Sequence, residues 1–366
     1  MVQVMVLLLI GISNLKRKRN IKKRTMYITS ICSLKRTVVV LLVTLMGGVI
    51  LSSCNQDEST LLPEFSNNKR PVQFDVNLKS NWNNKEGRSR LSRGVAADEF
   101  DASFGMFSGV YANDTVDKMI MNYMYNEECG EGADGWQTVS SYIMPSVGLE
   151  MSCYAYYPYQ DPEEELQFLT FNGGDSLHIG APYFDFVIPA NLTDQVDLMV
   201  AQTPFTTDRL IAKEHIPLHF YHMLTAVRFT VDESVPAGYI RKISIEGVTS
   251  GGRYAFDGTL DWAPNTILAD YVLERNIRTG TGSKVYLEDD EVFLMMPQFL
   301  NDQSKVKIVF DDEQPLTLTT SLDGKEWAAG KIVTYNIKIN SLHRLSLEAT
   351  IEPWEDGETF NWTSGY

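Results

Sequence analysis

Short runs in which apolar and polar residues alternate recur along most of the chain after residue 70. A period of two residues is typical of a strand with one face buried and the other exposed. In the first run, PVQFDVNL, the alternating apolar residues are Val72, Phe74, Val76 and Leu78. Val, Ile, Thr, Tyr and Phe dominate the runs, and clusters of Gly, Asp, Asn and Pro separate them. Because no long segment has a clean helical period, we expect an all-β protein built from sandwiches.

The number of expected strands and the length of the chain indicate two domains. The strands are expected in PVQFDVNL, FGMFSGVY, MIMNYMY, LEMSCYAYYPY, YFDFVIPA, VDLMVAQT, LTAVRFTV, IRKISIEGV, DEVFLMMPQ, KVKIVFD, PLTLTTSL, IVTYNIKI and LSLEATIEPW. A polar stretch, TPFTTDRLIAKEH, separates two groups of them. We therefore expect an N-terminal β-sandwich over residues 71–207 and a C-terminal β-sandwich over residues 208–366.

The N-terminal part changes from apolar to acidic residues at Cys54. Lys35 and Arg36 precede the apolar residues 37–50, and small residues follow, as in an export signal. The apolar run is shorter than the roughly 20 residues that a spanning helix needs, although a membrane-anchoring helix is the alternative. The sequence LSSC resembles a lipobox, which implies cleavage before Cys54 and lipidation of this residue.

Residues 1–53 are accordingly interpreted as a signal peptide and residues 54–70 as a lipidated tether. Residues 1–25 hold a second apolar run and a basic run, so we expect Met26 as the true start and residues 1–25 as a mis-called one. A real, unusually long signal is the alternative. The sequence NQDEST after the cysteine resembles the tag of lipoproteins exposed on the outer membrane of Bacteroidota.

The charge of the chain argues against nucleic acid as a partner. The 32 Lys and Arg stand against 47 Asp and Glu, which gives a net charge of −15. Nine of the basic residues lie in the signal segment, so the remaining chain is more acidic still. An anionic protein without a basic stripe repels nucleic acid and anionic lipid. We expect it to reach a membrane through its own lipid alone.

Motifs for catalysis, metals or cofactors are not expected in this chain. His215 and His219 have the spacing of a zinc-binding helix, but Pro217 lies between them and His222 follows in a strand-like pattern. The chain has no nucleophile elbow, and the glycine-rich GVTSGG lacks the lysine and helix of a phosphate-binding loop. Paired acidic residues are interpreted as loop charges. We therefore expect neither enzymatic activity nor a cofactor or metal.

Segments spread over the mature chain resemble, in order and spacing, the fimbrillin family of Bacteroidota, which are lipoprotein precursors of type V pilus subunits. The segments are PVQFDVNL, RSRLSRG, YAYYPY, QVDLMVAQT, LHFYHMLTAVRFTV with ISIEGV, and WAAGKIVTYNIKI with LEATIEPWEDG. The resemblance implies two transthyretin-like β-sandwich domains in tandem. It also implies a surface-exposed precursor on the outer membrane, a final place in the fimbrium, and adhesion to host or bacterial surface ligands.

The resemblance further implies assembly with other pilin subunits by strand exchange. A protease cuts after an arginine, the first strand leaves, and a strand of a partner fills the exposed groove. The polar stretch after the first run holds three candidate cut sites, Arg88, Arg90 and Arg93. We expect cleavage between Arg93 and Gly94, with the other two arginines as weaker candidates. The alternative is a loop that is never cut.

Two further pairs of residues are candidates for covalent modification. Cys129 and Cys153 remain after processing, and we expect a disulfide between them, with two free buried thiols as the alternative. Thr115 and Ser176 each follow an aspartate and precede an aliphatic residue, which resembles the O-glycosylation signal of this phylum.

The aromatic run YAYYPY supports a second functional hypothesis. Tyr154, Tyr156, Tyr157 and Tyr159 belong to this run, and exposed aromatic rings in a row would bind a glycan. A surface-anchored glycan-binding lipoprotein that does not polymerise is therefore the alternative function. Burial of these rings in a sandwich core favours the pilin interpretation instead.

Overall fold

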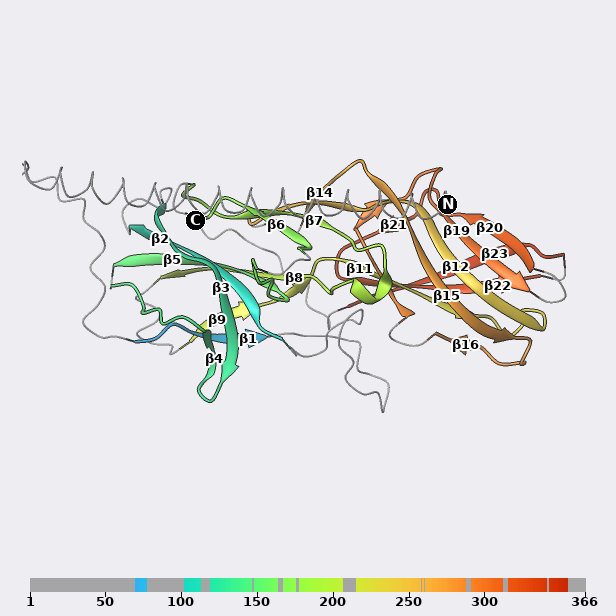
Figure 1. Ribbon diagram of the computed structural model, residues 1–366, viewed down its shortest axis with the longest axis horizontal. Helices are drawn as coiled ribbons and strands as arrows, with labels where there is room; N and C mark the ends of the chain where they lie inside the picture. Colours follow the sequence, from blue (N-terminus) through green and yellow to red (C-terminus); the bar gives the residue numbers. More distant parts are fainter. Residues whose placement is uncertain are drawn as a thin grey trace, which may run out of the picture. The chain divides into compact units, whose positions relative to one another are not determined.

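The computed structural model describes residues 70–77, 102–112, 119–146, 148–163, 167–175, 178–206, 215–257, 259, 261–287, 291–311, 315–340 and 342–354. They all belong to one compact unit, residues 63–366. Strands β1 to β23 and one 3-10 helix, η1 (Leu192–Asp194), make up its regular structure (Figure 1). None of these residues belongs to a helix long and apolar enough to cross a membrane. The predicted all-β class is confirmed.

The largest sheet closes on itself. In spatial order its strands are β10 (Tyr221–His222), β8 (Met199–Thr206), β5 (Leu149–Tyr157), β2 (Phe104–Ala112), β3 (Met119–Gly132), β4 (Gly135–Thr138), β1 (Gln73–Asn77) and β9 (Ile216–His219). The two outermost strands, β9 and β10, are consecutive in the chain, with Phe220 between them. The β9–β10 segment, residues 216–222, therefore joins the two ends of the sheet, which we call the closed sheet.

The inside of the closed sheet is filled by its own side chains. The buried residues there are Val72, Phe74, Phe104, Met106, Met124, Cys129, Met151, Cys153, Ala155, Tyr157, Met199, Ala201, Ile216, Leu218 and Phe220. Alternate residues of a strand point to opposite faces, so the period-two runs supply this core from one face. In Figure 1 the strands β2, β5 and β8 lie above β1, β4 and β9, and the long β3 bends between the two groups.

The outer face of β2 and β5 packs against a second sheet, which combines distant parts of the chain. Its spatial order is β14 (Trp262–Pro264), β13 (Gly251–Ala255), β7 (Tyr183–Val187) and β6 (Leu169–Asn172). Aromatic rings fill the space between the sheets: Phe107 and Tyr156 lie 5.1 and 4.8 Å from Phe171. We call this the shared sheet, because β6 and β7 precede residue 207 and β13 and β14 follow it.

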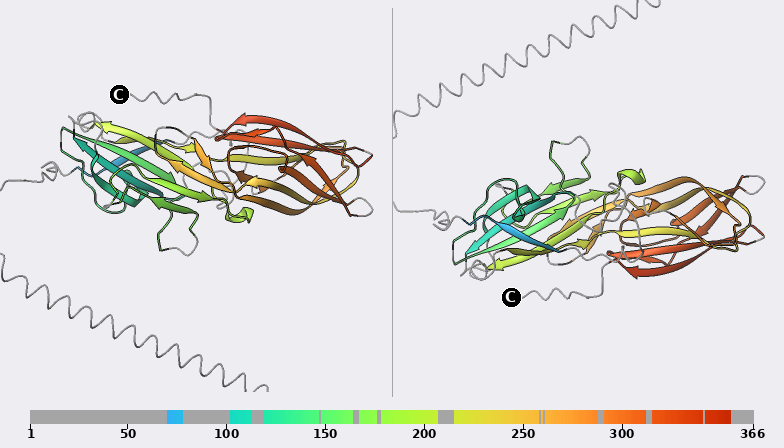
Figure 2. Two further views of the ribbon diagram at one scale, coloured as in Figure 1. Left: turned by 90° about the horizontal axis from the view of Figure 1, so that it is seen from above. Right: turned by 90° about the horizontal axis from the view of Figure 1, so that it is seen from below.

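The remaining strands form two sheets whose buried residues contribute to one continuous core, and Figure 2 shows them as two layers. The first sheet has the order β16 (Val285–Tyr286), β11 (Thr225–Val231), β22 (Lys331–Ile339) and β23 (Leu345–Pro353), with β17 (Phe293–Met295) also on β11. The second has the order β15 (Leu268–Thr279), β12 (Gly238–Thr249), β19 (Lys305–Asp311) and β20 (Pro315–Ser321). A short pair, β18 (Gln298–Phe299) and β21 (Glu326–Trp327), completes the structure.

Every segment expected to be a strand contains one, but the strands of the two halves are interleaved. β9 and β10 complete the closed sheet, and β13 and β14 complete the shared sheet, although all four follow the expected domain boundary. Residues 207–214, where that boundary falls, lie outside the described residues. The division into residues 71–207 and 208–366 stays a prediction. At the turn between β3 and β4, Gly135 has φ of 96°, a conformation that favours glycine.

Candidate functional site

β1 lies between two neighbours in the closed sheet and is held by few backbone pairs. It is antiparallel to β4, where Gln73 and Phe74 face Gln137 and Trp136. It is parallel to β9, where residues 74–77 face residues 216–219. We call the position between β4 and β9 the β1 seat. The sequence analysis did not predict β9, the parallel neighbour of β1, although Ile216, Leu218 and Phe220 alternate with polar or small residues in IPLHF.

The apolar side chains of β1 and of the residue before it point into the core of the closed sheet. Val72 and Phe74 are each 1% exposed, and Val76 is half-buried against the same core. The Phe74 ring meets Phe104 edge-on at 6.0 Å, and Phe104 in turn lies 5.3 Å from Phe220. Burial of a large apolar side chain contributes about 1.5–3 kcal/mol. An empty β1 seat would therefore expose apolar surface that only another strand of similar pattern covers.

Polar contacts fix the register of β1 at its outer face and before its first residue. Asp75 Oδ1 lies 3.0 Å from His215 Nδ1, which joins β1 to the residue just before β9. Val72 N donates to Tyr142 O at 3.0 Å, and Met144 N donates to Arg70 O at 3.0 Å. These bonds hold residues 70–72 against residues 142–144. A single hydrogen bond contributes about 0.5–1.5 kcal/mol, so each is weak compared with the burial of a large apolar side chain.

Cys129 and Cys153 lie in the core behind β1, and both are free and buried. Burial raises the pKa of Cys153 to about 12 and also raises the pKa of Cys129. Since the thiolate is the reactive form, both thiols are inert while the core is closed.

The expected disulfide between Cys129 and Cys153 is therefore absent from the structure. β2 separates the two cysteines: Cys129 pairs with Phe104 on one side of it, and Cys153 pairs with Ser108 on the other. Two strand spacings of about 4.8 Å put the Cα atoms at least about 10 Å apart. A disulfide requires Cα atoms closer than about 7 Å. The alternative of two free thiols is the arrangement observed.

The three histidines do not converge on a common point. His215 contacts Asp75, whereas His222 Nδ1 lies 3.0 Å from Asp197 Oδ1 in the interior. His219 lies in β9, opposite Asn77 of β1. Among the residues that the structure describes, no group of three His, Cys, Asp or Glu side chains is placed to hold a metal ion.

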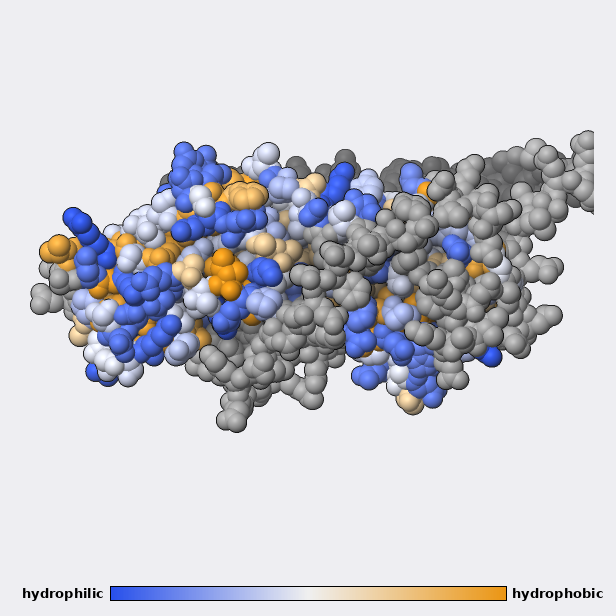
Figure 3. All heavy atoms as spheres, turned by 180° about the vertical axis from the view of Figure 1, so that it is seen from behind, coloured by the Kyte–Doolittle hydropathy of each residue, from blue (hydrophilic) through white to orange (hydrophobic). Residues whose placement is uncertain are grey.

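The YAYYPY tyrosines are part of the core. Tyr154, Tyr156 and Tyr157 are buried, and Tyr159 packs partly buried against the larger core. Tyr154 faces the shared sheet, with its ring 5.5 Å from Phe256. This run is therefore no exposed platform for a glycan. On the face of the molecule drawn in Figure 3, apolar and polar side chains are interspersed.

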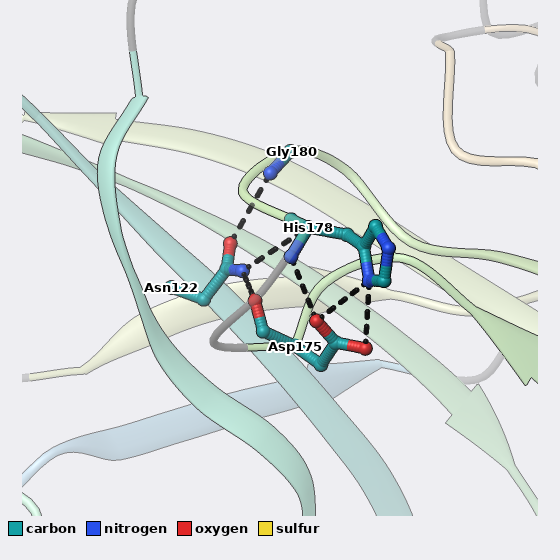
Figure 4. Close-up of polar contacts among 4 residues, drawn as sticks. All are labelled: Asn122, Asp175, His178 and Gly180. Atoms are coloured by element: carbon teal, nitrogen blue, oxygen red, sulfur yellow. Dashed lines mark hydrogen bonds and ion pairs between the residues drawn. The ribbon is translucent and has the colours of Figure 1, made fainter.

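A side chain of β3 ties down the loop that precedes β7 (Figure 4). The Asn122 amide nitrogen donates to the carbonyl oxygens of Asp175 and of His178, the latter at 3.2 Å. Its amide oxygen accepts from Gly180 N at 3.3 Å, and His178 N donates to Asp175 Oδ1 at 2.7 Å. Asn122 thus fixes the two ends of the stretch that contains Ser176.

The other expected sites lie outside the described residues, and they stay predictions. They are the lipidation site Cys54, the cleavage sites Arg88, Arg90, Arg93 and Gly94, the strand residue Leu78, and the O-glycosylation sites Thr115 and Ser176.

Comparisons with known proteins agree with this architecture. A family model described as fimbrillin-like matches residues 99–354, a region that begins after β1. The fimbrium subunit Fim1C of Phocaeicola vulgatus is 24% identical over 218 residues, which are 57% of this chain and 55% of that protein. The match thus spans about half the length of that relative.

A solved structure has the same fold. A fimbrial protein from Bacteroides vulgatus superposes with a TM-score of 0.52, and the alignment covers 78% of this chain and 99% of that chain. At 17% sequence identity this similarity concerns the fold alone.

Proposed function

The chain belongs to the fimbrillin-like family of fimbrial structural and adhesion subunits, which are not enzymes, and we propose that it polymerises by exchange of β1. The expectation of no enzymatic activity agrees with this family. The precursor is exported as a lipoprotein anchored through Cys54 to the outer membrane. Cleavage then releases the subunit from its anchor, and the subunit enters the fimbrium.

The construction of the β1 seat is the observation that supports this proposal. β1 is short, pairs with β4 only at Gln73 and Phe74, and lies before the region that the family model matches. Phe74 in β1 and Val72 directly before it are fully enclosed, so the departure of this segment leaves an apolar groove bordered by free backbone groups. An extended strand of another subunit restores both the apolar contacts and the hydrogen bonds.

Cleavage after Arg93 accounts for the release of β1. A cut there separates residues 54–93, including the lipid and β1, from the rest of the subunit. The arginines Arg88, Arg90 and Arg93 all follow β1, whereas Arg70 precedes it. A cut at Arg70 would remove the lipid and leave β1 in place.

Two finer points belong to the same proposal. The closed sheet with the shared sheet, and the two remaining sheets with their common core, are taken as two transthyretin-like sandwich domains. Thr115 and Ser176 carry O-linked glycans, and Asn122 fixes the ends of the stretch around Ser176.

Treatment of the purified full-length precursor with an arginine-specific protease tests this function. We expect a new N-terminus at Gly94 by sequencing and oligomers, by size-exclusion chromatography, only after the cut. Replacement of Arg88, Arg90 and Arg93 together by alanine abolishes both, and Arg70→Ala is the matched control that leaves both intact. Normal surface assembly by the triple variant would reject strand exchange through arginine cleavage.

The anchor is tested separately. Cys54→Ala should abolish labelling of the precursor with a radioactive fatty acid and shift the protein out of the membrane fraction. Unchanged labelling would rule out Cys54 as the lipidated residue.

A further inference from the structure

Trp354 is an enclosed side chain at the end of an exposed strand. Residues 348–353 of β23 are all exposed, whereas Trp354 directly after them is 0% exposed. Its backbone N donates to Gly330 O at 2.9 Å. A large side chain buried alone after six exposed residues acts as an anchor, because its contacts decide where the strand ends.

Trp354 belongs to the larger core, but one face of its ring is covered by the closed sheet. The Trp354 ring stacks on the His222 ring, with centroids 4.2 Å apart and planes within 5°. His222 ends β10, and its Nδ1 lies 3.0 Å from Asp197 Oδ1, with both side chains almost completely buried. Neighbouring backbone bonds run from Met223 N to Leu198 O at 2.9 Å and from Gly330 N to Leu224 O at 3.0 Å. We call Asp197, His222 and Trp354 the aromatic clasp.

The same short segment borders β1 at its other end. In the β9–β10 segment, residues 216–219 pair with β1, and Tyr221 and His222 pair with β8. Between them, Phe220 N donates to Asn77 O at 3.2 Å, and the Phe220 ring lies 5.3 Å from Phe104 in the core behind β1. These seven consecutive residues thus connect the β1 seat to the clasp: their first four pair with β1 and their last two pair with β8.

We propose that the β9–β10 segment couples occupancy of the β1 seat to the aromatic clasp, so that loss of β1 releases the C-terminal end of β23. Without β1, residues 216–219 lose their hydrogen bonds on one side, and Phe220 loses its bond to Asn77. The parallel stack of His222 on Trp354 depends on the position of that segment. Through this coupling, the loss of β1 loosens the end of β23 at Trp354, far from β1 in the sequence.

Coupling between two sites is reciprocal, which gives the proposal two independent readouts. Loosening β1 must loosen the clasp, and opening the clasp must loosen β1. The coupling rests on the proposed function only in that cleavage is the event that empties the seat. Both readouts use the uncleaved chain, so their failure leaves strand exchange untouched, and a failure of cleavage leaves the coupling untouched.

Hydrogen exchange of the purified full-length chain measures both directions. In Phe74→Ala we expect exchange to rise at least tenfold in residues 216–222 and in residues 350–354. β20, an edge strand of the facing sheet, should remain unchanged. A rise confined to β1 and β9, with residues 350–354 unchanged, would overturn the proposal.

The reverse experiment opens the clasp. Trp354→Ala should raise exchange in β1 at least tenfold, whereas Trp327→Ala, which removes an equally enclosed tryptophan, should not. If the two variants raised exchange in β1 equally, the effect would be general destabilisation, and the proposed coupling would be rejected. If Trp354→Ala does not fold, His222→Gln removes the stack while keeping a polar group beside Asp197, and the same outcome is required of it.

Discussion

β1 and β22 are both interior strands, but they are held very differently. β22 pairs with β11 from Lys331 to Ile337 and with β23 along its whole length. β1 pairs with β4 only at Gln73 and Phe74, and with β9 over residues 74–77. Both strands bury apolar side chains completely, so apolar burial alone does not distinguish them.

The difference indicates which of the two strands would disrupt fewer backbone pairs if it were removed. Removal of β22 would separate β11 from β23 and open a core shared by two sheets. Removal of β1 opens the closed sheet at one place, while β2, β3, β5 and β8 keep their mutual pairing. Local opening of a protein is drawn from such sparsely paired regions, whereas densely paired strands open only with the whole fold.

Two phenylalanines allow a matched comparison of β1 with the sheet that contains β22, because Phe229 lies in β11 opposite Tyr335 of β22. Phe74 in β1 and Phe229 in β11 are each 1% exposed. Phe229→Ala should lower the free energy of global unfolding by about 3–5 kcal/mol, as expected for a large core truncation. Phe74→Ala should lower it by less, because β1 detaches before the rest of the protein unfolds. Urea denaturation followed by circular dichroism measures both, and equal losses would contradict the comparison.

Labelling of the free thiols Cys129 and Cys153 tests the same comparison without unfolding the protein. In the native chain, Cys129 and Cys153 should resist a maleimide reagent. Phe74→Ala should raise their labelling rate roughly 10- to 100-fold, equivalent to about 1.4–2.7 kcal/mol of easier opening. Mass spectrometry of the labelled peptides identifies each thiol. A similar increase in Phe229→Ala would show that the thiols report global unfolding instead of the vacated β1 seat.

The two regions should also lose stability at opposite ends of the pH scale. Burial raises the pKa of Cys153 to about 12 in the folded chain, so its stabilising contribution is complete below about 9 and declines as the pH rises toward 12. In the second half, hydrogen bonds from Ser234 and then Asn336 lower the pKa of Asp232 to about 2. Its contribution is complete above about 3.9 and is lost as the pH falls toward 2.

Urea unfolding midpoints at pH 3, 7 and 9.5 test this opposition. Cys153→Ala should flatten the decline between pH 7 and 9.5, before most tyrosines of the unfolded chain ionise. Asp232→Asn should flatten the decline between pH 7 and 3. If either variant keeps the slope of the native chain in its own range, the corresponding group does not control stability there.

The alternating pattern predicted most of the long strands, including β12 with its shifts in register, and missed β15. β15 holds Asp270, Glu274, Arg275 and Arg278, and its pairing with β12 shifts register between Ile240 and Lys242 and between Ile245 and Val248. The buried and half-buried residues of β15 keep a period of two, at positions 269, 271, 273, 277 and 279, but Arg275 takes the place between 273 and 277, and the apolar Val272 is exposed. The apolar alternation in the sequence is therefore interrupted, so the pattern did not reveal this strand.

Neighbours that are distant in the chain were beyond prediction from the sequence. Nothing local in YFDFV indicates that β7 pairs with β13, and nothing in PVQFDVNL indicates that β1 lies parallel to β9. The cysteine pairing was wrong for the same reason, because β2 lies between the two strands that carry them. The candidate strand β1 itself was predicted, since its alternation and its two enclosed residues follow from period two alone.

The shared sheet also has a consequence for biosynthesis. A ribosome makes the chain from its N-terminus, and domains commonly fold in that order as they emerge. Here β1 and β8 each lack one pairing partner until residues 216–222 have been made, and β7 lacks one until β13, residues 251–255, has been made. The N-terminal half of the nascent chain therefore cannot complete its folding before much of the C-terminal half has been synthesised. Until then, three strands keep an unpaired edge that holdase chaperones would be suited to cover.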